Sequence, residues 1–380
     1  MKIHDCKRFS GYKPCFPDHN CWEDGCKDHI PAGTKILIVN LDAMGDVLMT
    51  TAQLPGLKRK FPESTIWWIT LKIAAPLLHN NQYIDKVLTY DAESLSILEQ
   101  MKFDYVMNVD KSQRSCSILN SVNAKHKLGF GMDNNGKIIP MNKGANYNYR
   151  LGMDDHFKFR VNQRTGQDYL AETFELDFQG DDYTFNFTED ELKFIADYKK
   201  KVKLRDNQFV VGFNTGCSTL FPNKKMTVEQ HISLIDKLLK KKKYKIVLLG
   251  GPEDTERNKK IYSKFRGKII NTPTDGGVRK GACYESLADV IITGDSFGMH
   301  LGIALKKFII VWFGVSCWTE IELYDRGIKL YQEDLFCSPC WKKSCPYDLE
   351  CIKMIDQKKI IGEVEKYYKS VKPVRDAKSK

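Results

Sequence analysis

One carboxylate, Asp46, stands at a predicted junction between a strand and a helix. Residues 36–39 are continuously apolar, and a Met-Gly-Asp turn follows them closely. Such a run is typical of a strand buried on both faces of a parallel sheet, and the loops after such strands bind ligands. Gly45 permits a tight turn that leaves room for a substrate. Asp46 is therefore interpreted as a catalytic carboxylate or as the cap of a helix over residues 47–60.

Two loops in the second half of the sequence have the composition of a nucleotide diphosphate site. The first, residues 215–225, follows a predicted strand and offers hydroxyl groups and lysines; its candidate contacts are Thr215, Ser218, Thr219, Lys224 and Lys225. The second is a Gly-Gly turn. Its bare backbone at Gly251 lets a nucleoside approach, and Glu253 is suited to accept hydrogen bonds from ribose hydroxyls.

A third loop, residues 294–300, follows another apolar strand and opens a helix. The free N–H groups and the positive end of a helix stabilise a phosphate. Its candidate contacts are Asp295, Ser296, Gly298 and His300. The alternative interpretations are that Asp295 and Ser296 cap the helix and that His300 is a partly buried, hydrogen-bonded residue.

The alternation of strands and helices predicts an α/β fold with two doubly wound, Rossmann-like parallel sheets. The chain has 380 residues and is 42% apolar, which is enough apolar material for two hydrophobic cores. We therefore expect two domains with a cleft between them. We expect irregular structure over residues 127–180. The predicted strands are residues 36–39, 65–70, 86–90, 105–109, 208–214, 245–249, 289–293 and 308–313, and the predicted helices include 47–60, 92–101 and 227–243.

These segments, in this order, resemble glycosyltransferase family 9 of the heptosyltransferase type. The similarity covers most of residues 33–355 and is carried by NLDAMGDVLMTTAQLPGLKRKFP, NTGCSTLFPNKK and TGDSFGMHLGIALKKFIIVWFG. The resemblance implies the GT-B fold, an ADP-heptose donor, inversion, and no metal in the active site. Carried over to this sequence, Asp46 is the general base, Lys224 contacts phosphate, and Asp295 with Ser296 contacts the donor.

The resemblance also implies a division of the chain into four parts. Residues 1–32 form a cysteine-rich segment, 33–180 an acceptor domain, 181–336 a donor domain, and 337–380 a cysteine-rich knuckle with a terminal helix. The acceptor is then a hydroxyl of a lipopolysaccharide core sugar or of a protein.

The sequence departs from the family pattern near two of these loops. Met226 and Thr227 replace the usual Trp-Pro, which makes Lys225 a competitor of Lys224 for the phosphate. Phe297 stands where a glycine is expected, and Gly298 follows it. These changes favour, as an alternative, a transferase that uses another nucleotide sugar.

Eight of the twelve cysteines form two clusters outside the predicted sheets. The spacing of Cys337 and Cys340 is typical of a metal knuckle, which Cys345 and Cys351 complete. A second, looser cluster comprises Cys6, Cys15, Cys21 and Cys26. Structural zinc or iron is expected: iron competes with zinc because family members that modify autotransporters, which this chain resembles, have a cysteine-bound iron near the carboxy terminus. The other four, Cys116, Cys217, Cys283 and Cys317, are interpreted as ordinary buried or loop residues.

The charge and hydropathy of the sequence restrict where the protein is expected in the cell and which classes of partner it is expected to bind. The net charge is +11, but no motif for nucleic acid is present. We find neither a membrane span nor a signal peptide, so a cytoplasmic protein is expected, with peripheral contact at an anionic inner membrane as a further expectation. Assembly into a homo-oligomer is compatible with the sequence. The non-enzymatic alternative is a metal-dependent scaffold on the same fold.

Overall fold

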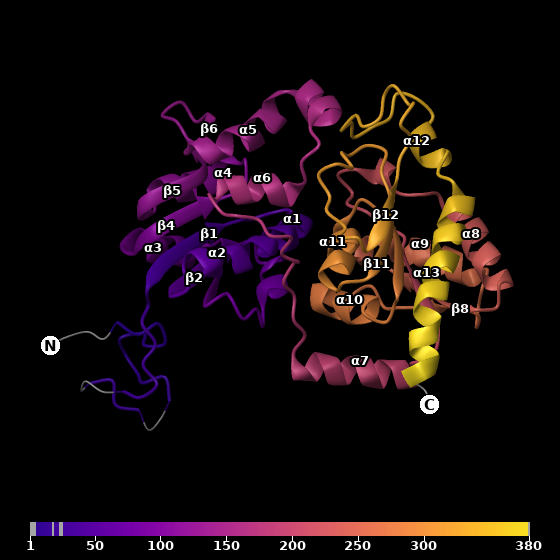
Figure 1. Ribbon diagram of the computed structural model, residues 1–380, viewed down its shortest axis with the longest axis horizontal. Helices are drawn as coiled ribbons and strands as arrows, with labels where there is room; N and C mark the ends of the chain where they lie inside the picture. The colour runs from indigo at the N-terminus through magenta and orange to yellow at the C-terminus, as the bar shows by residue number, and fades with distance from the viewer. Residues whose placement is uncertain (1–4, 17–18, 23–25, 379–380) are drawn as a thin grey trace. The chain divides into compact units, whose positions relative to one another are not determined.

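The structure, a computed structural model, describes residues 5–16, 19–22 and 26–378 (Figure 1). The chain divides into two compact units. The first comprises Met1–Ala43, Thr50–Arg150 and Gln167–Asp181, and the second comprises Met44–Met49, Leu151–Gly166 and Asp182–Lys380. Parts of the predicted segment 1–32 and the last two residues of the terminal tail lie outside the described residues.

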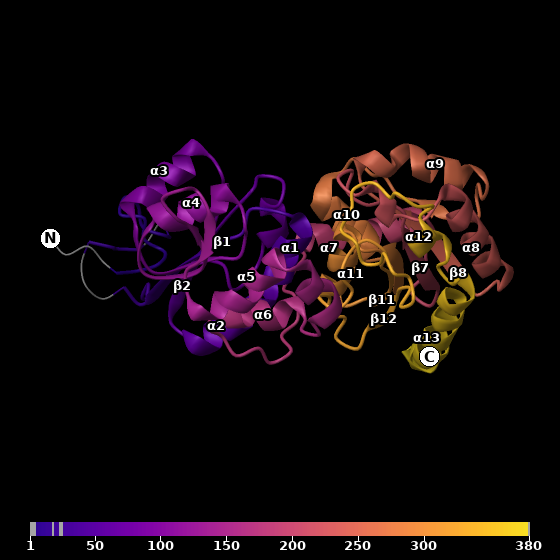
Figure 2. The ribbon, with the colours of Figure 1, turned by 90° about the horizontal axis from the view of Figure 1, so that it is seen from above.

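The first unit is built on a six-stranded sheet in the order β3-β2-β1-β4-β5-β6, the doubly wound order of dinucleotide-binding folds. Every neighbouring pair is parallel except β5 and β6. In Figure 2, α3 and α4 lie on one side of the strands and α2 and α6 on the other. The strands are β1 Thr34–Val39, β2 Ser64–Thr70, β3 Lys86–Thr89, β4 Lys102–Asn108, β5 Asn123–Met132 and β6 Ile138–Pro140.

The second unit repeats this order, since its sheet reads β12-β11-β10-β7-β8-β9. All of its neighbouring pairs are parallel. The strands are β7 Phe209–Asn214, β8 Tyr244–Leu249, β9 Ile270–Asn271, β10 Val290–Gly294, β11 Phe308–Trp312 and β12 Gly327–Leu330. Two doubly wound parallel sheets, as the sequence predicts, are thus confirmed.

Helices connect and cover the strands of both sheets. Figure 1 shows α13 running beside α8, and both pack on the core of the second sheet. The helices are α1 Met44–Thr50, α2 Leu54–Lys60, α3 Ala92–Gln100, α4 Gln113–Ser121, α5 Asn146–Met153, α6 Gly166–Thr173, α7 Glu189–Lys201, α8 Val228–Lys240, α9 Thr255–Ser263, α10 Gly277–Glu285, α11 Phe297–Ala304, α12 Glu350–Lys353 and α13 Gln357–Lys378. None of the helices in the described ranges is long and apolar enough to cross a membrane.

The central strand β1 is held at its carboxyl end by a buried aspartate. Ile36 and Val39 have no exposed surface, which fits a strand covered on both faces. Beyond the strand, the carboxylate of Asp110 accepts a hydrogen bond from the Asn40 side chain at 2.7 Å and another from the backbone N–H of Leu41. These bonds satisfy polar groups that would otherwise be buried without partners and fix the backbone that leads toward Asp46.

Two sequence expectations about local structure are wrong. The stretch 127–180 is not irregular, because it contains the end of β5, β6, α5 and α6. Its glycines permit close packing: a Cβ at Gly129 would lie 1.8 Å from the Asn108 carbonyl oxygen. The helix expected at 47–60 starts earlier and is split by a 3-10 turn at Thr51–Gln53, since Pro55 cannot donate the hydrogen bond that a continuous helix needs.

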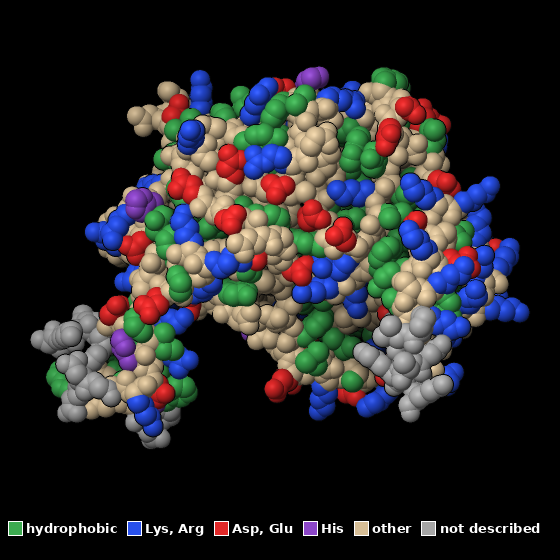
Figure 3. Space-filling view, viewed as in Figure 1, with side chains coloured by type: hydrophobic (Ala, Val, Ile, Leu, Met, Phe, Trp, Pro, Cys, Tyr) green, Lys and Arg blue, Asp and Glu red, His purple; other side chains and the backbone are tan. Residues whose placement is uncertain are grey.

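The lysine run 240–243, at the end of α8, is exposed to solvent. Lysine and arginine side chains gather at the right edge of Figure 3, over α8 and its neighbours. Lys240 pairs with Asp236 at 2.7 Å, and Lys241 and Lys243 lie 3.5 and 3.6 Å from Glu365. These cations therefore have acidic neighbours on the same surface.

Candidate active site

The candidate donor-binding residues gather at the carboxyl edge of the second sheet. The loops 215–225, 250–254 and 294–300 follow β7, β8 and β10, which are adjacent in the order β10-β7-β8. Because parallel strands end at the same edge, their loops converge there. The sequence predicted this gathering without showing which side chains make contact.

An ion pair between Lys224 and Asp295 joins two of these loops. The ammonium nitrogen of Lys224 lies 2.7 Å from Oδ2 of Asp295, and the side chains are only 14% and 13% exposed. Burial, the largest single effect, opposes ionisation of Asp295, but the charge and hydrogen bond of Lys224, with smaller contributions from His300 and Ser316, together outweigh it, so the pKa of this carboxyl is lowered. Lys224, and not Lys225, therefore makes the ion pair of this site.

The backbone of Lys224 is also held in place, by a hydrogen bond and by close packing. The indole N–H of Trp312, at the end of β11, donates to the Lys224 carbonyl at 2.8 Å. Gly294 has no Cβ, and one placed there would lie 2.6 Å from the same carbonyl oxygen. The ammonium also lies 5.3 Å from the Phe221 ring centroid and 5.0 Å from that of Trp341, within reach of cation–π attraction.

His300 brings Asp46 into the same cluster. Residues 44–49 belong to the second unit, and a Cβ on Gly45 would lie 2.5 Å from Cδ2 of the His300 ring. Burial lowers the pKa of His300, while the negative charges of Asp295 and Asp46 oppose that shift. The ring stacks near Tyr183, whose hydroxyl is 3.3 Å from Nδ1. At neutral pH the imidazole is therefore neutral.

Asp46 itself lies in the first turn of α1 and is exposed. The helix begins two residues before it, so Asp46 is inside the helix and is not its N-cap. A carboxylate in the first turn is favourably placed with respect to the helix dipole. Its exposed side chain, whose charge acts on the buried His300, is accessible from solvent.

Asn214, which sequence reasoning missed, organises the start of α11. Its Nδ2 donates to the Thr293 hydroxyl at 3.0 Å and to the Ser296 hydroxyl at 2.8 Å. Ser296 occupies the N-cap position, but its side chain makes no capping bond. A Cβ on Gly298 would lie 2.4 Å from Nδ2 of Asn214, so the glycine is required there. The signal for Asn214 was a polar residue at the end of an apolar strand.

The other candidates of the first two loops have different environments. Thr215 is fully buried, and its hydroxyl donates to Asn258 at 2.5 Å. Ser218, Thr219 and Glu253 are exposed. The backbone N–H of Gly251 donates to the carboxylate of Asp254 at 3.0 Å, a bond inside the turn.

Asp254 is a second residue that sequence reasoning missed. A Cβ on Gly216 would lie 1.9 Å from its Oδ2, so the carboxylate packs directly on the loop after β7. Burial raises the pKa of Asp254, while the nearby charge of Lys225 acts in the opposite direction. Lys225 therefore contributes positive charge near Asp254, whereas Lys224 forms a direct ion pair with Asp295.

The departures from the family pattern have local explanations in part. Met226 is fully buried in the core of the second sheet. Thr227 caps α8: its hydroxyl accepts from the Gln230 N–H at 3.1 Å, and the Gln230 side chain accepts from the Thr227 N–H at 2.9 Å. This reciprocal capping box accounts for a threonine at the position. Nothing in the structure explains Phe297.

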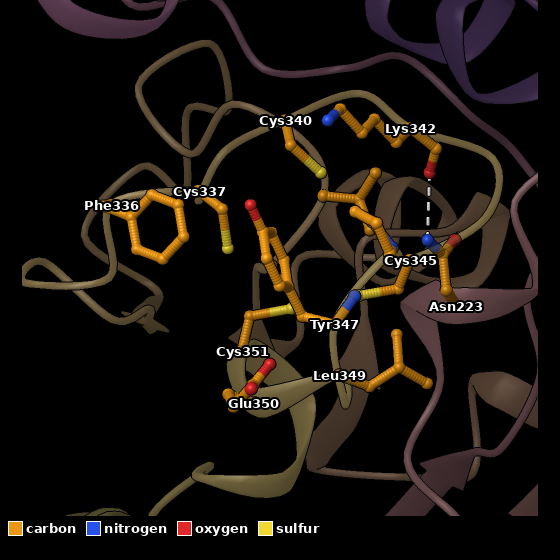
Figure 4. A pocket seen from close by; sticks show the side chains of 13 residues that line it. Asn223, Phe336, Cys337, Cys340, Lys342, Cys345, Tyr347, Leu349, Glu350 and Cys351 are labelled. Carbon is orange, nitrogen blue, oxygen red and sulfur yellow. Dashed lines mark hydrogen bonds between the residues drawn. The ribbon is translucent and has the colours of Figure 1, made fainter.

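The four carboxy-terminal cysteines, Cys337, Cys340, Cys345 and Cys351, line one cavity of about 190 Å³ (Figure 4). Burial and the neighbouring thiols raise the pKa of Cys351 to about 11. The backbone N–H of Tyr347 donates to the sulfur of Cys345 at 3.4 Å.

All twelve cysteines are free thiols, and Cys116, Cys217, Cys283 and Cys317 are buried. Cys15 and Cys26 both approach His19, whereas the structure gives Cys6 a backbone pairing with Pro31 and leaves Cys21 half-buried. Within the described ranges, no group of three or more histidine, cysteine, aspartate or glutamate side chains is arranged to hold a metal ion as it stands. The predicted metal sites are therefore not confirmed.

Comparison with protein families gives a match to glycosyltransferase family 9 (heptosyltransferase) over residues 95–350. Comparison with curated proteins gives no match. Among solved structures, the glycosyl transferase family 9 protein of Veillonella parvula DSM 2008 has a TM-score of 0.69 at 20% identity, covering 88% of this chain and 96% of that one.

Two further structures are similar in fold. E. coli ADP-heptose lps heptosyltransferase II has a TM-score of 0.59 at 16% identity, covering 79% of this chain and 91% of the other. The iron-containing dodecameric glycosyltransferase TibC from enterotoxigenic E. coli H10407 has a TM-score of 0.54 at 10% identity. The match covers 89% of this chain and 77% of the TibC chain. These likenesses confirm the two-domain GT-B architecture.

Removing the Lys224 charge should destabilise the second unit in a pH-dependent way. Lys224→Met leaves the largely buried Asp295 without its cation, and we expect a loss of about 3 kcal/mol at pH 7. The native pair lowers the pKa of Asp295, so its contribution to stability is present above the unfolded pKa and is lost as pH falls through the folded one. The difference between the two proteins should therefore be complete at pH 7 and reduced at about pH 3, below the unfolded pKa of about 3.9.

Urea unfolding at both pH values measures this difference. Lys225→Met, at the neighbouring half-buried lysine, is the matched control and should cost less than about 1 kcal/mol, as is usual for a substitution away from a buried ion pair. Equal losses in the two variants would show that the Lys224–Asp295 pair has no special role in stability.

Proposed function

Because the chain belongs to glycosyltransferase family 9, we propose that it transfers a heptose from ADP-heptose to an acceptor hydroxyl, with inversion at the anomeric carbon. One observation carries the proposal. Lys224 and Asp295, in direct contact, lie with His300 and Asp46 in one cluster at the carboxyl edge of the second sheet. The cluster combines a cation suited to a diphosphate with a carboxylate suited to receive a proton.

The donor diphosphate is expected at Lys224 and the start of α11. Negative charge accumulates on the diphosphate as the sugar departs, and a preorganised cation stabilises that charge most in a site with little water. Lys224 is 14% exposed and already fixed by Asp295. The first N–H groups of α11 add a positive helix end. Similarity to a structure described as an ADP-heptose lps heptosyltransferase supports adenosine diphosphate as the carrier.

Asp46 is proposed as the general base. The acceptor oxygen forms a bond to the anomeric carbon while the bond from that carbon to the phosphate oxygen breaks, so ADP leaves and the sugar configuration inverts. The acceptor proton passes to the Asp46 carboxylate. His300 beside it is neutral near pH 7, because burial lowers its pKa, and so it does not cancel the Asp46 charge.

The acceptor is proposed to be a hydroxyl of a lipopolysaccharide core sugar or of a protein. One fold neighbour is described as an lps heptosyltransferase, which supports a lipopolysaccharide sugar as the acceptor. TibC is described as an iron-containing glycosyltransferase, and that description names no acceptor. Each class supplies an alcohol oxygen, so the same base serves both. Assays of wild type and an Asp46 variant with the two acceptor classes distinguish them.

Calorimetric titration tests the donor. We expect ADP-heptose and ADP to bind at least tenfold more tightly than UDP or GDP, and Lys224→Met to weaken ADP binding because it loses the phosphate contact. A preference for UDP or GDP would preserve the transferase and change the donor. Folded protein that binds none of these nucleotides would support the scaffold alternative.

Asp46→Asn should abolish transfer while leaving donor binding intact. The amide retains the shape of the side chain but does not accept the acceptor proton, and we expect kcat to fall about 10²–10⁴-fold. Initial rates of ADP release with acceptor measure this, and ADP affinity from calorimetry is the internal reference. Asp42→Asn, at an exposed carboxylate 3.1 Å from Arg114, is the matched control and should retain wild-type turnover. Wild-type rates for Asp46→Asn would contradict the assignment.

A structural metal, iron or zinc, is proposed for the carboxy-terminal thiols. Four thiolates suit either metal in tetrahedral geometry, and the cavity they line is of sufficient volume for an ion. The N–H of Tyr347 at the Cys345 sulfur is the kind of bond that orients a thiolate ligand. Trp341, which follows Cys340, faces Lys224, so ordering this loop also orders one side of the donor site.

Cys340→Ser should lower the metal content by one ion per chain and lower the thermal unfolding midpoint. A hydroxyl is a poorer ligand for a thiophilic ion than a thiolate, and the bound metal stabilises only the folded loop. Elemental analysis and thermal unfolding measure the two effects. Cys116→Ser, at a buried cysteine of the first unit, is the control and should retain its metal. An unchanged metal content in Cys340→Ser would exclude this ligand set.

A further inference from the structure

The amino-terminal segment, residues 5–32, has almost no hydrophobic core. Among its described residues only Ala32 is a buried apolar side chain, whereas Tyr12 and Trp22 are 83% and 76% exposed. Its described part contains no helix or strand, only an isolated bridge between Cys6 and Pro31. Apolar burial of this size does not by itself offset the entropy of ordering the chain, so the segment depends on other interactions.

A histidine lies between two of the segment's thiols. The Nδ1 atom of His19 is 3.6 Å from the sulfur of Cys15 and 3.9 Å from that of Cys26. The other ring nitrogen, Nε2, is 2.8 Å from the carboxylate of Asp28. That carboxylate fixes the ring with Nε2 protonated and leaves the Nδ1 lone pair directed at the two sulfurs.

The two nitrogen–sulfur separations are close to those between ligands of one zinc ion, although the three side chains do not form a complete site as they stand. With a zinc–sulfur distance of about 2.3 Å and a zinc–nitrogen distance of about 2.0 Å, tetrahedral geometry puts nitrogen and sulfur roughly 3.5 Å apart. A single lone pair cannot accept good hydrogen bonds from two thiols, whereas a cation contacts all three atoms. The carboxylate behind the histidine is the usual second partner of a metal-bound imidazole.

We propose that this segment binds one zinc ion through Cys15, Cys26 and Nδ1 of His19, with Asp28 orienting the ring. Cys6 or Cys21, the other two thiols of the segment, supplies the fourth ligand. Binding releases the protons of the ligating thiols and draws their sulfurs inward, because the side chains as described do not yet form a complete site. This inference is independent of the proposed transferase activity.

A hydrogen bond attaches the end of the segment to the first sheet. Ala32, at its end, accepts a hydrogen bond from the Thr65 hydroxyl at 2.6 Å, immediately before β1 begins. A metal cross-link upstream of this bond closes the loop between residues 15 and 26 and so reduces the conformations open to the chain that enters β1.

Native mass spectrometry of the full-length protein purified with zinc tests the proposal. We expect Cys15→Ser, Cys26→Ser and His19→Ala each to hold one zinc ion fewer than wild type. Asp28→Asn should keep the ion at saturation but bind it about 10–100-fold more weakly. His29→Ala is the matched control, because that ring bonds the Asp5 carbonyl at 2.9 Å and not a thiol; it should keep the wild-type count.

A second measurement separates this site from the carboxy-terminal cluster. In Cys340→Ser the ion at His19 should persist. When Co²⁺ replaces zinc at that position, we expect an absorption band from thiolate-to-metal charge transfer. The intensity of this band should fall further in Cys15→Ser. Wild-type zinc counts in all three ligand variants would overturn the proposal. So would a mass two hydrogens below that of the free thiols, since it would identify the cross-link as a disulfide.

Discussion

The buried ion pair between Lys224 and Asp295 is the interaction on which the candidate site depends. It is made by two loops that follow different strands, so it forms only when β7 and β10 are paired in their observed register. Removal of two charges from water is costly unless each is compensated, which makes the pair a strong constraint on both loops. Asp295 is the partner of the Lys224 cation; in the proposed function, the donor diphosphate is a second acceptor for the same ammonium.

Around this pair, glycines let the backbone approach other residues closely, and these close contacts fix the positions of the remaining residues of the site. Gly45, Gly294 and Gly298 each occupy a position where a Cβ would be within 2.6 Å of another residue's atoms. Their small size lets the turn before Asp46, the strand β10 and the helix α11 pack against His300, Lys224 and Asn214 respectively. Such packing gives one arrangement of the site, because any larger residue displaces the backbone.

The two cysteine clusters relate to the site in different ways. The carboxy-terminal thiols lie in the same segment as Trp341, whose ring centroid is 5.0 Å from the Lys224 ammonium. The proposed metal, by ordering this segment, would therefore also position a ring next to Lys224. The amino-terminal thiols lie in the first unit, before β1, and their effect is on the stability of a segment with little apolar surface of its own.

Sequence by itself determined the fold class, eight of the twelve strands and the loops that carry the candidate site, because apolar runs and glycine turns depend on local chemistry. It missed β5, β6, β9 and β12. It also identified Asp46, Lys224 and Asp295 as candidates, partly through a family resemblance. It did not show that Lys224, and not Lys225, pairs with Asp295, that Asn214 and Asp254 hold the loops, or that His19 lies between two thiols. Those facts depend on side chains far apart in sequence, or on the path of a loop without periodic pattern, and only the tertiary structure fixes such distances.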